Sequence, residues 1–70
     1  MITKNDKRLG KKIKRIRKQR KFTQEQLADQ VRVTTKYIQY IETAKRIPSL
    51  KLLYRIARSL KIKVKDLFLL

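Results

Sequence analysis

The feature that most limits how this chain can fold is a pair of short amphipathic segments, over residues 24–30 and 35–42. Each begins with a helix-start signal, since Thr23 and Gln26 have the spacing of a capping box and Thr34 can cap the second segment. The apolar residues that lie on the facing sides of the two segments are Leu27, Ala28, Val31, Val33, Ile38 and Ile41. We therefore predict two packed helices joined by a tight turn, with the outer face of the second helix free.

This free face is polar, and it belongs to a strongly basic chain. The 70 residues include 21 Lys and Arg against 5 Asp and Glu, a net charge of +16. Such a charge destabilises a compact chain through self-repulsion and suits a polyanionic partner, although a lysine-rich genome is an alternative source of it. The residues of the free face are Thr35, Lys36, Gln39, Tyr40 and Thr43. A protruding polar helix on a basic domain is typical of proteins that bind double-stranded DNA.

The segments before this pair predict an arm and a first helix. Residues 1–6 are expected to form a flexible basic arm. Leu9, Ile13 and Ile16 follow helical spacing, which predicts a helix over residues 6–19.

The segments after the pair predict two more helices. Ser49 can cap a fourth helix, and a short fifth helix is expected over residues 64–69, with Leu67 and Phe68 closing the core. The inner face of the fourth helix is expected to carry Leu50, Leu53, Ile56, Ala57 and Leu60. The predicted fold class is all-α, with five helices in one domain over residues 1–70.

The residue types that the chain lacks exclude several classes of function. It contains neither cysteine nor histidine, so a zinc finger, a disulfide framework and His-based catalysis are excluded. No nucleophile–base pair or metal-ligand cluster can be assembled, and we expect neither an enzyme nor a bound cofactor or metal. The longest apolar run is Leu67 to Leu70, too short for a membrane span, and no signal peptide is visible. A cytoplasmic protein is expected, with no small-molecule ligand evident.

Four stretches, "FTQEQLADQV", "YIQYIE", "RIPSLKLLYRIARSL" and "KDLF", occur in an order and spacing that resemble a known family. The chain is similar, from about Leu9 to Phe68, to the phage repressor and Cro-type regulators of the xenobiotic-response-element (XRE) family. The resemblance implies a compact repressor-like domain with a helix-turn-helix at its second and third helices. It also implies a transcriptional regulator, expected to be a repressor that binds a pseudo-palindromic operator as a homodimer.

The resemblance carries site residues onto this chain. Thr35, Lys36 and Tyr40 match base-contacting positions of the family, with Gln39 beside them. Arg17 matches an arginine that pairs with the glutamate ending the third helix, here Glu42. Contacts to DNA phosphates are expected from Gln24, Thr34, Thr43, Lys45, Arg46 and Arg17. For Tyr40 the alternative is partial burial against a neighbouring loop. A solvated surface position is the alternative for Lys36, Gln39, Gln24, Thr43, Lys45, Arg46 and Arg17.

The chain departs from the family at three turns where glycine is usual, namely Arg32, Ala44 and Lys61. A side chain there costs on the order of 1 kcal/mol if the left-handed backbone conformation is kept.

Four apolar residues have no obvious place on the predicted inner faces, and they suggest a two-fold interface. The alternative is a tail that folds back on its own core. These residues are Leu52, Tyr54, Leu69 and Leu70.

The sequence is also compatible with two other functions. The same fold can serve as a protein-interaction module, such as a coactivator or an antitoxin, which would need a partner-binding face. A non-specific polyanion or membrane binder is a further alternative, but it would not need a polar, uncharged face, and the apolar stripe of the first helix is narrow for membrane insertion.

Overall fold

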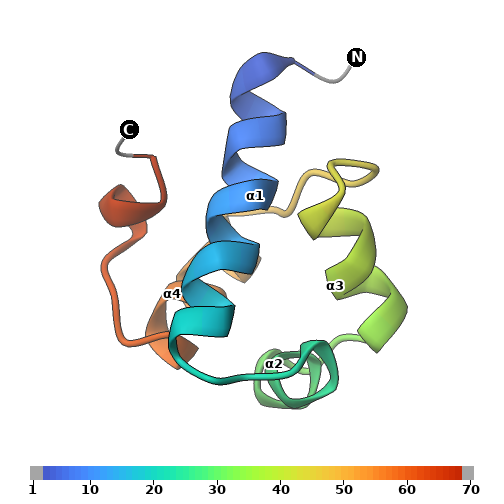
Figure 1. Ribbon diagram of the computed structural model, residues 1–70, viewed down its shortest axis with the longest axis vertical. Helices are drawn as coiled ribbons and strands as arrows, with labels where there is room; N and C mark the ends of the chain where they lie inside the picture. The colour runs from blue at the N-terminus through green and yellow to red at the C-terminus, as the bar shows by residue number, and fades with distance from the viewer. Residues whose placement is uncertain (1–2, 69–70) are drawn as a thin grey trace.

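The computed structural model describes residues 3–68, and this part of the chain is all-helical (Figure 1). It contains four α-helices, α1 (Lys4–Gln19), α2 (Gln24–Val31), α3 (Thr35–Glu42) and α4 (Leu50–Ser59), and a 3-10 helix, η1 (Val64–Leu67). The predicted all-α class is confirmed, but the count of five helices was wrong. The last turn closes at 3-10 spacing because the Asp66 and Phe68 N–H groups donate to the carbonyls of Lys63 and Lys65.

The basic arm expected over residues 1–6 is helical from Lys4 onward. Thr3 and Asp6 form a capping box, in which the Asp6 N–H donates to Thr3 Oγ1 at 3.1 Å and the Thr3 N–H donates to Asp6 Oδ2 at 2.9 Å. These bonds satisfy N–H groups that would otherwise lack partners at the helix start, so α1 extends about half a turn beyond the predicted limit. Residues 1 and 2 lie outside the described part.

The core is one cluster to which all four α-helices contribute, with α3 packed on α1 and α2 and α4 packed on α2. Its largest fully buried side chains include Ile13, Leu27, Ile38, Ile56 and Leu60. The inner residues of α2 and α3 were predicted from their spacing. Leu67 is also buried, which confirms that the chain after α4 returns to the core.

Three apolar positions differ from the prediction. Leu50 is 62% exposed whereas Leu52 is buried, so Leu52 belongs to the core and not to an exposed interface. The two residues differ by about 200° around α4, since each residue turns a helix by roughly 100°. Phe68 is 57% exposed and does not close the core. Tyr54 is exposed, and Leu69 and Leu70 lie outside the described residues.

All three turns where the family usually has glycine keep the left-handed conformation, with φ of 62° at Arg32, 61° at Ala44 and 59° at Lys61. Lys21, after α1, adopts the same conformation with φ of 61°. The chain therefore accepts a strain on the order of 1 kcal/mol at each of these turns, and three of the four carry a basic side chain.

Candidate nucleic-acid interface

The position of α3 is set by close packing of its C-terminal end against α1. Gly10 of α1 is buried, and a Cβ atom placed on it would lie 2.5 Å from the Ile41 carbonyl oxygen and 2.8 Å from that of Glu42. Only a residue without a side chain allows this approach. Ile38 and Ile41 turn the inner face of α3 into the core, so its opposite face is directed outward.

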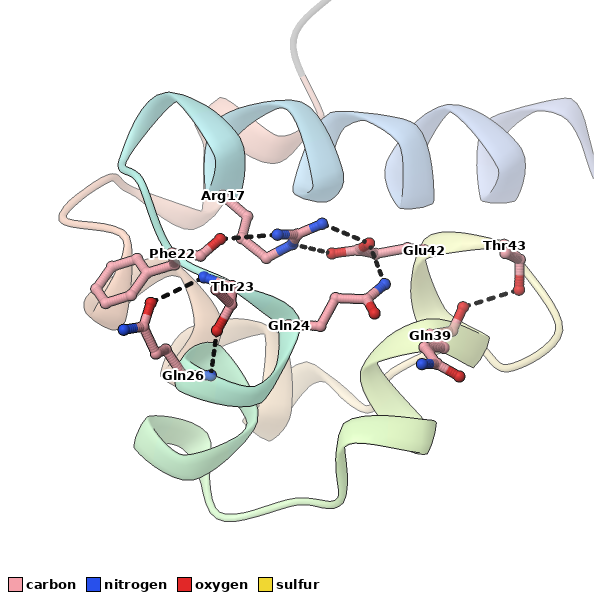
Figure 2. A network of polar contacts seen from close by, with 8 residues as sticks. All are labelled: Arg17, Phe22, Thr23, Gln24, Gln26, Gln39, Glu42 and Thr43. Atoms are coloured by element: carbon pink, nitrogen blue, oxygen red, sulfur yellow. Dashed lines mark hydrogen bonds and ion pairs between the residues drawn. The ribbon is translucent and has the colours of Figure 1, made fainter.

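A buried ion pair joins the same two helices (Figure 2). Arg17 Nε donates to Glu42 Oε2 at 2.6 Å and Arg17 Nη2 donates to Glu42 Oε1 at 3.2 Å, so the pair is bidentate. Arg17 Nη1 donates to the Phe22 carbonyl at 2.7 Å, and Gln24 Nε2 donates to Glu42 Oε1 at 3.0 Å. The network links α1, the turn after it, α2 and α3. The ion pair that the resemblance implied is therefore present.

This network changes the roles expected for two residues. The Arg17 side chain is 7% exposed, and all three of its nitrogen atoms donate within the domain. The structure therefore does not support the predicted contact between Arg17 and a DNA phosphate. Gln24 is half-buried and its amide donates to Glu42. Gln24 remains a candidate through its backbone N–H group at the start of α2.

The outer face of α3 presents the predicted base-contacting residues. Lys36 and Gln39 are exposed, and Thr35 and Tyr40 are partly exposed. Lys45 Nζ lies 5.8 Å from the centre of the Tyr40 ring, within the range of a cation–π contact. This contact connects a side chain of α3 with the loop that follows the helix.

Thr34 and Thr43, which were expected to contact DNA phosphates, are the N-cap and C-cap residues of α3. Thr34 Oγ1 accepts the Tyr37 N–H at 3.1 Å, which leaves the Thr34 hydroxyl hydrogen free to donate outward. Thr43 Oγ1 donates to the Gln39 carbonyl at 2.8 Å (Figure 2). The Thr43 N–H donates to the same carbonyl. Both donors of Thr43 are thus used inside the domain, so the structure does not support a phosphate contact from Thr43.

The loop after α3 is held in one conformation by its backbone. The N–H groups of Lys45 and Arg46 both donate to the Tyr40 carbonyl, at 2.8 and 3.2 Å, and Ala44 is buried in the left-handed conformation. The side chains of Lys45 and Arg46 are exposed. Two cations are therefore displayed from a fixed loop beside the polar face of α3.

The sequence of most of the chain, residues 13–67, matches the helix-turn-helix family. The chain belongs to this family, as an XRE-type transcriptional regulator. The regulator is 43% identical over 58 residues to an uncharacterized HTH-type transcriptional regulator of Archaeoglobus fulgidus, covering 83% of this chain and 82% of the relative. It is also 43% identical over 56 residues to the immunity repressor protein of Bacillus phage phi105, covering 80% of this chain and 39% of that protein. The resemblance drawn from the sequence is confirmed.

Two solved structures of regulators share the fold. One is SinR, the master regulator for biofilm formation, in complex with DNA, with a TM-score of 0.79, 28% identity, and coverage of 84% of this chain and 95% of that chain. The other is the restriction-modification controller protein C.AhdI from Aeromonas hydrophila, with a TM-score of 0.86, 26% identity, and coverage of 89% of this chain and 94% of that chain.

Two lysines of the regulator that the sequence pattern did not assign to the interface lie beside the loop after α3. Lys7 and Lys11 of α1, together with Glu42, Thr43 and Ala44, line a hollow of about 140 Å³. Their spacing of four residues places both on one side of α1, but only the packing of α1 against α3 brings that side to the loop. In the sequence they were just one pair within a long basic segment.

The described residues include neither a cluster of possible metal ligands nor a candidate membrane-spanning helix. Within residues 3–68, no three or more acidic side chains are grouped so that they could hold a metal ion. In the same part of the regulator, no helix has the length and apolar character needed to cross a membrane.

Proposed function

We propose that this regulator recognises a specific double-stranded DNA sequence by placing the outer face of α3 in the major groove. The observation that carries the proposal is that α3 is fixed from behind by Gly10 and the Arg17–Glu42 pair, while its opposite face presents uncharged and basic polar groups. Side chains held on a rigid helix can match base edges, whose donor and acceptor patterns in the major groove differ between base pairs.

Each proposed base-contacting residue has a distinct chemistry. Lys36 can donate to guanine O6 and N7, and the Gln39 amide can form paired hydrogen bonds with adenine. Thr35 can place its methyl group on a thymine methyl or donate through its hydroxyl. Tyr40 offers a ring to thymine methyl groups, and its contact with Lys45 limits the positions of that ring.

Phosphate contacts would come from residues around the two ends of α3 and from α1. The exposed cations of the following loop, Lys45 and Arg46, are the strongest candidates, and Lys7 and Lys11 extend the same basic surface. Thr34 and the start of α2 at Gln24 complete the set. Such contacts position a protein on the duplex without specifying sequence. The DNA complex of SinR, which shares this fold, supports this mode of binding.

We further propose that the regulator is a repressor, which acts as a homodimer on a pseudo-palindromic site. Leu50 and Tyr54 are one turn apart on α4 and are 62% and 58% exposed, so they form an apolar strip that a second copy could cover. A two-fold dimer would then place two α3 helices on half-sites about one helical turn apart. The immunity repressor among the relatives supports a repressor over an activator.

The experiment that tests the proposal is selection of bound duplexes from a random pool. An inverted repeat among the enriched sequences is the expected result, and an enriched single half-site would support sequence recognition without the dimer. A selection that enriches no motif would contradict sequence-specific binding.

The alternative is a protein-interaction module, such as a coactivator or an antitoxin. It is favoured by one observation, the exposure of the large apolar residues Ile47, Leu50, Tyr54 and Phe68. If selection enriches no motif and the purified chain remains monomeric, this exposed apolar surface is the better candidate for the functional site.

A further inference from the structure

A basic hollow lies between α2 and α4, the two helices that pack together on another side of the domain from the outer face of α3 (Figure 1). It has a volume of about 190 Å³. We call it the arginine hollow, and its lining residues are Gln30, Val31, Arg32, Arg55, Arg58 and Ser59. None of them belongs to α1, to α3 or to the loop after α3, so the arginine hollow shares no residue with the proposed DNA interface.

The three arginines concentrate positive charge without a compensating acid. No Asp or Glu lines the arginine hollow. The guanidinium groups of Arg32, Arg55 and Arg58 are on exposed residues, and none forms a hydrogen bond or ion pair with any residue from 3 to 68. The chain has 8 arginines and 13 lysines, yet the hollow takes three arginines and no lysine. This choice matters because the planar arginine fork matches the oxygen atoms of a phosphate, whereas lysine acts as a point charge.

Ordinary structural roles account for only part of this cluster. Arg58 lies in the last turn of α4, where a cation interacts favourably with the helix dipole. Arg55 lies three residues earlier, on the same side of the helix, where a second cation repels the first. Arg32 holds a left-handed conformation that glycine would adopt at lower cost, and its long side chain brings a third charge to the same place.

We propose that the arginine hollow is a second phosphate-binding site, which takes a backbone phosphate of a second DNA duplex. The proposal rests on the proposed function for the class of ligand, because it assumes that this protein binds duplex DNA. Arg32, Arg55 and Arg58 supply the charge-assisted donors, and Ser59 and Gln30 add neutral ones. A phosphodiester presents several oxygen atoms, so it can accept hydrogen bonds from more than one of the three arginines that line the hollow.

The separation of the two sites allows one domain to hold two duplexes. Gln24, at the proposed interface, and Val31, at the arginine hollow, are the first and last residues of α2. The hollow is formed by the end of α2, the turn after it and α4, whereas the proposed interface is formed by α1, the start of α2, α3 and the loop after α3. A second duplex would therefore contact the hollow from another side of the domain (Figure 1).

The test is a bridging assay in which a duplex on beads captures a second, fluorescent duplex through the protein. Binding of one fluorescent duplex in solution is measured in parallel. The test variant is Arg55→Gln/Arg58→Gln, and the matched control is Lys51→Gln/Lys65→Gln, which removes the same charge at exposed positions outside the hollow. Thermal melting of both variants checks that the fold is kept.

We expect the test variant to lower bridging by roughly tenfold or more, the effect of losing a charge-assisted hydrogen bond, and the control to change it by less than about twofold. Single-duplex binding should change by similar small factors in the two variants. Bridging that is absent in the parent, or equal in the two variants, would overturn the second site. Failure of the parent protein to bind a single duplex would instead overturn the proposed function.

A second measurement identifies the ligand class. In the ¹⁵N-labelled protein, the arginine Nε–Hε signals of Arg55 and Arg58 should shift when duplex is added beyond one equivalent. Shifts with oligoglutamate but not with excess duplex would overturn the proposal and assign the hollow to an acidic polypeptide. Bridging that depends on Lys36 but not on these arginines would also overturn it, because a dimer with one duplex on each α3 would then explain the bridge.

Discussion

Arg17 Nε lies 2.6 Å from Glu42 Oε2, and this contact joins the C-terminal part of α1 to the last residue of α3 inside the domain (Figure 2). The two side chains are 7% and 2% exposed. Every nitrogen atom of the guanidinium group donates to a protein acceptor, and both carboxylate oxygens accept. The pair therefore fixes the end of the helix whose outer face is proposed to contact bases.

Removing one partner of this pair should strongly destabilise the fold. Arg17→Ala or Glu42→Ala should each lower the free energy of unfolding by about 3–5 kcal/mol, because the remaining charge is left buried and unpaired. The double variant should lose much less than the sum of the two. Urea unfolding measures these values, and Arg15→Ala, an exposed arginine of the same helix, is the control. Additive losses below about 0.5 kcal/mol would show that the pair behaves as a solvated surface contact.

Adding one methyl group at Gly10 should also destabilise the protein. Alanine is favoured over glycine in a helix by about 1 kcal/mol, but the new Cβ would be 2.5 Å from the Ile41 carbonyl oxygen. We expect Gly10→Ala to lower the free energy of unfolding by about 1–3 kcal/mol, since α3 must move away from α1. Lys14→Ala, at an exposed position of α1, should change it by less than about 0.5 kcal/mol. A higher melting temperature for Gly10→Ala would contradict the close approach of the two helices.

Lys36 should matter for sequence preference and not for folding. Its side chain is exposed on the outer face of α3, so Lys36→Ala should leave the melting temperature nearly unchanged. It should cost about 1–3 kcal/mol of preference at one base position per half-site, measured by competition between selected and altered duplexes. Lys65→Ala, an exposed lysine of η1, should keep the parent preference. If the Lys36 variant also keeps it, α3 does not contact bases through this residue.

Arg46 should contribute to affinity for all sequences alike. Its side chain is exposed on a loop whose backbone is tied to Tyr40, so truncation removes a phosphate contact without loosening α3. In a plot of log binding constant against log salt concentration, Arg46→Ala should reduce the slope by about one unit. Lys65→Ala again serves as the control with an equal loss of charge. An unchanged slope for the Arg46 variant would remove this residue from the phosphate contacts.

The start of α1 should weaken as the pH falls. The backbone N–H of Thr3, and then the Thr3 hydroxyl, hydrogen-bond the Asp6 carboxylate and hold its pKa below the ordinary value of 3.8. Because the folded pKa is depressed, the carboxylate contributes its full stability above that ordinary value and loses it as the pH falls through the lower, folded pKa. NMR titration of the Asp6 carboxyl group measures the pKa directly, and Thr3→Ala should move it back toward 3.8. A pKa at or above 3.8 in the parent protein would contradict the capping box.

The sequence by itself determined the presence and the order of the four α-helices, because the signals involved act over a few residues. The capping residues Thr23, Thr34 and Ser49 lie directly before α2, α3 and α4, and each accepts the predicted kind of bond from a backbone N–H. The inner residues of α2 and α3 followed from helical spacing. The resemblance to a family added the Arg17–Glu42 pair, which no local pattern could reveal.

Only the tertiary structure decided which side of each helix meets another helix. A rotation of about 200° around α4 separates Leu52, in the core, from Leu50, outside it, although both are leucines two residues apart. Arg17 faces inward and Lys11, on the same basic helix, lies beside the loop after α3 because α1 packs on α3. The three arginines of the hollow come from the turn after α2 and from α4, which are far apart in the sequence. The side of a helix that each residue occupies in the folded domain depends on long-range packing, which is set by the shape of the whole core. A pattern of neighbouring residues does not contain this information.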